Sequence, residues 1–289
     1  MRRRTLARES PVLRGVGLFS ASPASVRFLP APPGTGVRIR RTDLPTIDPL
    51  PATVDHVTSD SACCGLPPGI PPRNTTLVTG STLVARTIEH AMSALAGLGI
   101  TDAIIEIDAP ELPILDGSAL AYVEALAPLA QDATNTIEPL TLAREVMVRD
   151  GEATILATPR AAPGCSIEYR LQYPPGSGLG SQAARWDGTP EAFVREVAPA
   201  RTFCLAKEAH ALRAAGLFTH VSPREMLVIA PDGTPVDNAL RFPDEPARHK
   251  LLDLIGDLAL LGRPLQADVL ATRSGHAHTH AMVRVLLAT

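Results

Sequence analysis

The sequence predicts an α+β fold built from two similar two-layer sandwich domains. Three observations lead to this prediction. The 289 residues alternate between short strand patterns and amphipathic helix patterns. An apolar helix that opens on Glu89-His90 is echoed by a second one with Arg248-His249 near its start. A polar segment separates the two halves, so we expect domains at 1–131 and 139–289 joined by a linker at 132–138.

The first half contains strand patterns followed by two helix patterns. The expected elements are, in order, strands at 25–29 and 37–41, a loop-rich stretch at 43–80, a helix at 87–98, a strand at 103–107 and a helix at 118–126. Thr87 is the expected N-cap of the first helix, and Gly97 and Gly99 are expected to stop it.

The second half contains longer strands. The expected elements are a strand at 166–173, a loop at 174–181, helices at 190–197 and 206–215, a strand at 226–230, a long apolar helix at 246–261 and a strand at 265–272. The strand at 166–173 alternates without a break, which predicts one face in water.

Composition excludes several classes of protein. A net charge of −3 argues against a nucleic-acid binder, which usually has a strongly basic domain. Four cysteines are too few for a disulfide framework, so we expect a cytoplasmic protein. No apolar run reaches the ~18 residues of a membrane span, and we therefore expect no stable membrane insertion.

His249 and Asp253 are four residues apart on the helix at 246–261, with Asp257 one turn further on. Residues at this spacing share a helix face, so an imidazole and a carboxylate could hold one metal ion. The same pattern also fits a solvated polar face with a weak His–Asp pair.

His90 lies away from the apolar stripe of the helix at 87–98, next to Glu89. This arrangement places a candidate base beside a candidate metal ligand, but an exposed Glu-His pair at a helix start would look the same.

Three further histidines, His276, His278 and His280, follow Gly275. In a strand all three would share a face and suggest a metal site, whereas in a helix only His276 and His280 would align. A solvated, histidine-rich edge is equally compatible with the pattern. His56, His210 and His220 have no partner pattern and no assigned role.

Taken together, these loci fit metal-assisted hydrolysis of an amide or ester. Two histidines and one aspartate leave a coordination position of zinc open to water. A neighbouring glutamate could take a proton from that water, and a further histidine could protonate the leaving group.

At these residues the chain resembles the zinc-dependent UDP-3-O-acyl-N-acetylglucosamine deacetylases of lipid A biosynthesis. The resemblance runs from Gly15 to Leu287. Its most specific blocks are TIEHAMSALAGLG at 87–99, PELPILDGS at 110–118, ARTF at 200–203, LRFPDEPARHKLLDLIGD at 240–257 and SGHA at 274–277. Such blocks in the right order are stronger evidence than any short motif.

The resemblance implies that the active site lies between the two domains. It implies zinc, or iron(II) in the cell, held by His90, His249 and Asp253, with Glu89 as the general base. It further implies that His276 is the cationic partner that protonates the leaving amine, with Asp257 as its supporting carboxylate. Thr202 would donate a hydrogen bond to the oxyanion, Phe203 would contact the sugar, and Lys250 would pair with anionic groups of the substrate.

The chain also departs from the family pattern. Phe19 stands where many members have histidine, and the segment 219–226 lacks the usual glycine-rich, asparagine-containing sequence. These changes leave two alternatives open: a zinc deacylase of another N-acyl amino sugar, and a non-catalytic binding protein for a sugar nucleotide or lipid. An acylated substrate would require only peripheral contact with a membrane.

Overall fold

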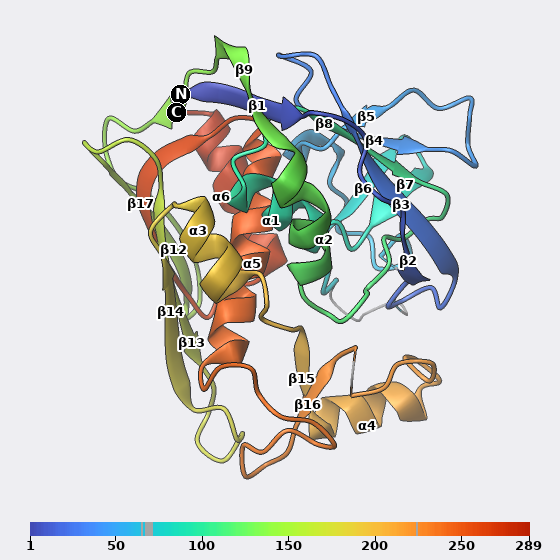
Figure 1. Ribbon diagram of the computed structural model, residues 1–289. Helices are drawn as coiled ribbons and strands as arrows, with labels where there is room; N and C mark the ends of the chain where they lie inside the picture. The colour runs from blue at the N-terminus through green and yellow to red at the C-terminus, as the bar shows by residue number, and fades with distance from the viewer. Residues whose placement is uncertain (65, 67–71, 224) are drawn as a thin grey trace.

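The computed structural model describes residues 1–64, 66, 72–223 and 225–289. Two mixed sheets face each other, and two helices lie between them (Figure 1). These helices are α1 (Glu89–Gly97) and α5 (Glu245–Leu258), and they pack directly against each other. The α+β class expected from the sequence is confirmed.

The first sheet has the order β2-β3-β8-β4-β5. Its strands are β2 (Leu13–Val16), β3 (Pro23–Pro30), β8 (Ala103–Ile107), β4 (Val37–Arg41) and β5 (Leu50–Pro51). Helices α1 and α2 (Leu120–Leu126) lie beside this sheet (Figure 1). Apolar residues from the strands and from both helices belong to one buried core.

The second sheet has the order β11-β12-β17-β13-β14, with β10 paired to β17. Its strands are β11 (Val146–Asp150), β12 (Ala153–Pro159), β17 (Leu265–Thr272), β13 (Ser166–Gln172), β14 (Ser181–Trp186) and β10 (Leu140–Thr141). Helices α5 and α6 (His276–Leu287) pack against it.

The two sheets repeat one topology. In each, the central strand follows the inner helix: β8 follows α1, and β17 follows α5. Each central strand has an antiparallel neighbour on one side, β3 or β12, and a parallel neighbour on the other, β4 or β13. The internal echo in the sequence therefore corresponds to a repeated fold, while the domain boundaries at 131 and 139 stay a prediction.

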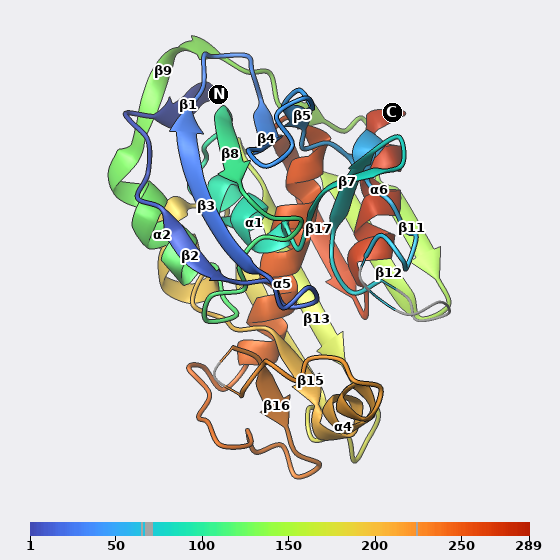
Figure 2. The same cartoon turned by 90° about the vertical axis from the view of Figure 1, so that its right-hand side faces the viewer.

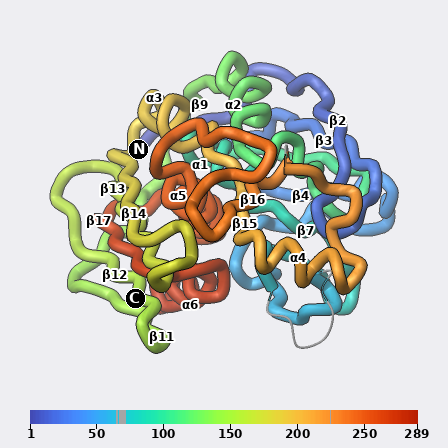
Figure 3. The backbone as a smooth tube through the Cα atoms, turned by 90° about the horizontal axis from the view of Figure 1, so that it is seen from below, coloured from blue at the N-terminus to red at the C-terminus, as the bar shows by residue number. Residues whose placement is uncertain are grey.

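Three small two-stranded sheets are also formed by the described residues. They pair β1 (Arg2–Leu6) with β9 (Ala130–Thr136), β6 (Thr76–Thr79) with β7 (Thr82–Arg86), and β15 (Phe203–Leu205) with β16 (Leu227–Ile229). The last pair and helix α4 (Ala206–Ala214) extend below the α5 helix (Figures 1 and 2). In the view from below, β15 and β16 lie nearer to α5, and α4 lies farther to one side (Figure 3).

The structure differs from the expected elements at several points. Much of the segment expected as a linker is strand β9, because β1 supplies the hydrogen-bond partners that the sequence pattern does not reveal. Strand β6 lies inside the stretch expected to be loop-rich, and β7 follows directly after it; residues 65 and 67–71 of that stretch are outside the described residues. The helix expected at 190–197 is a short α3 (Pro190–Ala192) that continues as a π-turn.

Thr87 is not the N-cap of α1. Ile88 occupies that position and makes no side-chain cap bond, so the helix begins at Glu89. The backbone of Thr87 has a φ of 57°, and its hydroxyl donates to the buried carboxylate of Glu111 (2.9 Å). Thr87 therefore shapes the turn that leads into the helix.

Among the described residues, no helix combines the length and the apolar character needed to span a bilayer.

Candidate functional site

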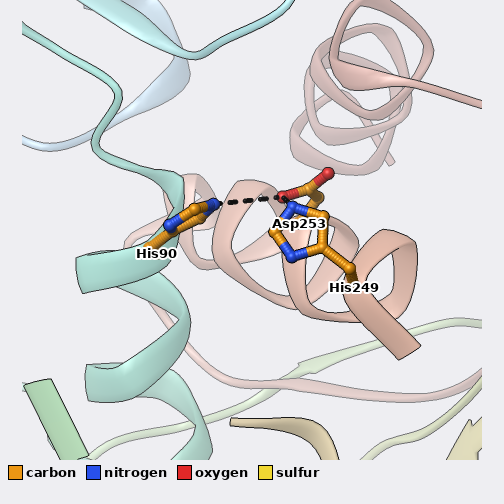
Figure 4. Close-up of side chains that lie close together, drawn as sticks. All are labelled: His90, His249 and Asp253. Atoms are coloured by element: carbon orange, nitrogen blue, oxygen red, sulfur yellow. Dashed lines mark ion pairs between the residues drawn. The ribbon is translucent and has the colours of Figure 1, made fainter. Parts of the chain in front are cut away.

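The side chains of His90, His249 and Asp253 meet where α1 contacts α5 (Figure 4). His90 comes from α1, while His249 and Asp253 lie one turn apart on α5. One ligand atom from each lies within 4.8 Å of the others, and all three side chains are buried. The two imidazole Nε2 atoms are 3.8 and 3.3 Å from Asp253 Oδ1. This group could hold a metal ion.

The hydrogen bonds of this group fit a bound cation. His249 Nδ1 lies 3.1 Å from the carbonyl oxygen of Ala200, which can only accept, so Nδ1 carries the proton. Burial lowers the pKa of His249 and lowers that of His90 to about 3, which keeps both rings neutral. The Nε2 lone pair of His249 then faces a carboxylate oxygen. A cation between these two acceptors removes their repulsion, and zinc accepts both donor types.

Lys250 holds the other oxygen of the same aspartate, with 2.6 Å between Nζ and Asp253 Oδ2. Burial disfavours the ammonium, but the carboxylate of Asp253 outweighs this effect and raises the pKa of Lys250. Burial opposes the charge of Asp253, but the ammonium of Lys250 beside it keeps the pKa of this carboxyl lowered. Lys250 is therefore charged and leaves Oδ1 of Asp253 for the metal group.

Glu89 opens α1 beside His90 and is buried. Its Oε2 accepts a hydrogen bond from the backbone N–H of Thr75 (3.0 Å). Burial raises the pKa of Glu89 to about 8, while the neighbouring His276 opposes this rise. A cation at the adjacent group would favour the carboxylate form. Glu89 is thus a carboxyl group whose pKa lies close to neutral pH.

His276 opens α6 and forms a buried pair with Asp257 of α5. Its Nδ1 donates to Asp257 Oδ2 (2.7 Å), and its Nε2 lies 3.9 Å from Asp253 Oδ2. Burial disfavours the imidazolium, but the carboxylate of Asp257 outweighs it and raises the pKa of His276 to about 9. His276 is therefore protonated at neutral pH and can donate a proton.

One cavity of about 500 Å³ is lined by every residue to which the family resemblance gives a role, except Asp257. Asp257 does not line the cavity and lies behind His276, to which it is hydrogen-bonded. Thr202 is held by its backbone, which donates to Gly117 and accepts from Leu227. Phe203 stands edge-on to the ring of His249, with 6.4 Å between centroids.

Basic and apolar residues both line the cavity. The basic residues are Arg73, Lys250 and Arg273, and Arg73 pairs with Glu208 of the same lining. Phe19 and Phe218 also line the cavity and pack edge to face, with 5.2 Å between their ring centroids. A separate small cluster with Leu18, Ile114 and Val221 at its centre supports these two rings. Phe19 therefore presents an aromatic ring to the cavity, beside Val221 and Met226 from the described part of 219–226; Arg224 is outside the described residues.

Thr75, Glu111 and His280 are part of the site but were not predicted from the sequence. Glu111 accepts from the backbone of Phe19 and Ser20, which fixes the loop at one end of the cavity. Thr75 and His280 contact Oδ1 of Asp257, the carboxylate oxygen that is not bonded to His276. Only the spacing of His276 and His280 gave a signal, and it required knowing that the segment is a helix.

The sequence matches the family described as LpxC, UDP-3-O-acyl N-acetylglycosamine deacetylase, over residues 3–288. A protein of Nostoc named UDP-3-O-acyl-N-acetylglucosamine deacetylase is 38% identical over 293 residues, covering 99% of both chains. The proteins of that name from Anaeromyxobacter dehalogenans and Chlamydia felis are 38% and 35% identical and cover 95% and 94% of this chain, and 84% and 92% of their own. The chain belongs to the UDP-3-O-acyl-N-acetylglycosamine deacetylase family and is a hydrolytic enzyme, a deacetylase.

Proposed function

We propose that the chain removes the N-acetyl group from UDP-3-O-acyl-N-acetylglucosamine and releases acetate and the free amine, in the cytoplasm, as a step of lipid A biosynthesis. The observation that carries this proposal is the convergence of a metal-ligand group, a buried glutamate and a protonated histidine in one cavity. The names of the relatives indicate the substrate. The basic and apolar residues that line the cavity suit a nucleotide sugar with an acyl chain.

Zinc, or iron(II), held by His90, His249 and Asp253 would polarise the amide carbonyl and lower the pKa of a water toward about 7. Glu89 takes the proton of the attacking water as the oxygen bonds to the carbonyl carbon. Thr202, on the cavity wall, donates a hydrogen bond to the carbonyl oxygen as it gains negative charge.

His276 acts on the other side of the scissile bond. Its imidazolium first balances the negative charge on the carbonyl oxygen and then gives its proton to the amide nitrogen as the carbon–nitrogen bond breaks. Asp257 keeps the ring charged and oriented through the 2.7 Å bond to Nδ1. Phe203 contacts the sugar, and Lys250 attracts the anionic part of the substrate.

A mass-spectrometric assay tests the proposal. Zinc-loaded protein is incubated with UDP-3-O-acyl-N-acetylglucosamine, with Glu89→Gln as the control that keeps the size of the side chain. The wild type should release one acetyl group per substrate, and Glu89→Gln should lower kcat by about 10²–10⁴ while still binding one zinc. Full activity of the variant would rule out the glutamate as the base.

The apolar wall of Phe19 and Phe218 favours one alternative, a different N-acyl amino sugar as the substrate. Zinc binding without turnover of the tested compound, together with deacetylation of another member of a substrate panel, would favour this alternative. Absence of both zinc and turnover would leave a binding protein.

A further inference from the structure

We propose that His280 is a positioning residue for the Asp257–His276 pair, and that it acts through the hydroxyl group of Thr75. His280 does not line the cavity, so it has no contact with a substrate there. It is nevertheless buried, one helical turn after His276 on the same face of α6. This inference rests on the role proposed above for His276.

The hydrogen-bond donors behind Asp257 can be assigned by counting protons. The Thr75 hydroxyl has one proton, and its oxygen lies 2.5 Å from Asp257 Oδ1, which can only accept. The hydroxyl therefore donates to Asp257. His280 Nε2 lies 3.0 Å from the same hydroxyl oxygen, whose proton is already used, so Nε2 must be the donor.

The result is a directed chain of hydrogen bonds. His280 Nε2–H donates to Thr75, and Thr75 donates to Oδ1 of Asp257. Oδ2 of Asp257 accepts from His276 Nδ1 (2.7 Å), which leaves Nε2 of His276 on the side of the metal group. Each bond restricts the rotation of the next group, and a buried network of this kind gains strength from its neighbours.

Thr75 also connects the two groups proposed to move protons. Its backbone N–H donates to Glu89 Oε2 (3.0 Å), and its side chain supports the carboxylate that orients His276. By donating a hydrogen bond to Thr75, His280 keeps the Thr75 side chain in one rotamer. It thereby also fixes the direction in which His276 presents its proton. Without that donor, the hydroxyl oxygen can accept instead from the Nδ1–H of His276, which lies 3.4 Å away, and draw that proton away from Asp257.

Two substitutions at His280 test the role of its donor. His280→Phe keeps a ring in the buried space but has no N–H, whereas His280→Gln places an amide N–H about where Nε2 lies. We expect His280→Phe to lower kcat about 10–100-fold, as loss of an outer partner does at related sites, with KM within about twofold. His280→Gln should recover most of kcat.

A double-mutant cycle tests the route through Thr75. Thr75→Val removes the hydroxyl and keeps the shape of the side chain. If His280 acts through that hydroxyl, the double variant should lose no more kcat than Thr75→Val alone. Thr76→Val is the matched control, because Thr76 is the next residue, is equally buried and has its hydroxyl on Asn74, so kcat should stay within about twofold.

A spectroscopic readout separates positioning from general destabilisation. In protein labelled with ¹⁵N-histidine, the Nδ1–H signal of His276 should shift in His280→Phe and return in His280→Gln. Independent losses of kcat that multiply in the double variant would overturn the proposal, as would an unchanged kcat in His280→Phe. If His276→Ala kept full activity, the role of His276 itself would fail instead.

Discussion

Hydrogen bonds on the far side of two ligand candidates, His249 and Asp253, decide which of their atoms is free for the metal. Ala200 takes the Nδ1 proton of His249, and Lys250 occupies one oxygen of Asp253. Nε2 of His249 and Oδ1 of Asp253 therefore stay available, and His90 Nε2 approaches the same oxygen from α1. These contacts orient the ligands before an ion arrives, which reduces the conformational entropy lost on binding.

His90→Ala should abolish stable metal binding, because it removes the ligand that α1 contributes. Elemental analysis of dialysed protein should give about one zinc per chain for the wild type and far less for the variant. Bound metal also stabilises the fold by about 2.7 kcal/mol when free zinc is 100 times its Kd. A chelator should lower the Tm of the wild type but hardly change that of His90→Ala.

His210→Ala is the control for this measurement, since His210 lies on the exposed surface of α4, outside the metal-ligand group. It should bind zinc as the wild type does. A zinc content near one per chain in His90→Ala would show that the ion sits elsewhere.

At the scale of elements, two glycines set the distances between packed segments. A Cβ on Gly256 of α5 would lie 2.1 Å from the carbonyl oxygen of Glu89 in α1, so the two backbones touch there. A Cβ on Gly97, at the other end of α1, would lie 2.3 Å from the ring of Phe193. The first contact joins the helices that hold the metal group, and the second does not.

Gly256→Ala should therefore push α1 and α5 apart, with a cost of about 1–3 kcal/mol in the free energy of unfolding and at least a tenfold loss of zinc affinity. Gly97→Ala should cost a similar free energy while zinc affinity stays within about twofold. Urea unfolding and competition with a zinc-binding dye measure the two quantities. Equal losses of affinity in both variants would contradict the argument.

The same elements show what the sequence can and cannot predict. Strand β17 and helix α5 were predicted almost to the residue, because their apolar patterns are long and regular. Strand β9 was not, since its polar sequence forms a strand only when paired with β1. Helix α1 ends at Gly97, and Gly99 has a left-handed φ of 69°, as the sequence predicted; the close contact of Gly97 with Phe193 could not be predicted.

Part of the candidate site could likewise be predicted and part could not. The spacing of His249 and Asp253 fixes a shared helix face, whatever surrounds it. The position of Thr75 behind Asp257 depends on a contact between residues 182 positions apart, for which a single sequence has no signal. Residues that touch a substrate are often recognisable from their type, whereas residues that orient them are recognisable only in three dimensions.

At the scale of the whole molecule, the site joins helices next to the central strands of the two similar sheets. Glu89 and His90 come from α1 before β8, His249 and Asp253 from α5 before β17, and His276 from α6 after β17. The N-terminal strand ties parts of the N-terminal half together, because β1 pairs with β9 and Arg3 of β1 forms an ion pair with buried Asp102 before β8 (3.1 Å). Global stability should therefore depend on groups far from the metal centre.

Asp102 makes this dependence measurable through pH. Burial raises its pKa, but the hydroxyl of Thr101, the N–H of Gly36 and the guanidinium of Arg3 outweigh burial and lower the pKa below its usual value. The folded state thus binds the proton less readily than the unfolded state. The stabilisation is complete above the unfolded pKa of about 3.9 and is lost as pH falls through the lower folded pKa.

Asp102→Asn should accordingly cost about 1–3 kcal/mol at pH 7, because an amide would turn a donor toward the donors that now surround the carboxylate. Urea unfolding from pH 7 to pH 4 measures the difference between wild type and variant. It should be constant down to about pH 5 and then shrink, since only the wild type has this carboxyl group to protonate on unfolding. A difference that grew toward pH 4 would mean that the folded protein raises the pKa of Asp102, and that burial outweighs its hydrogen bonds.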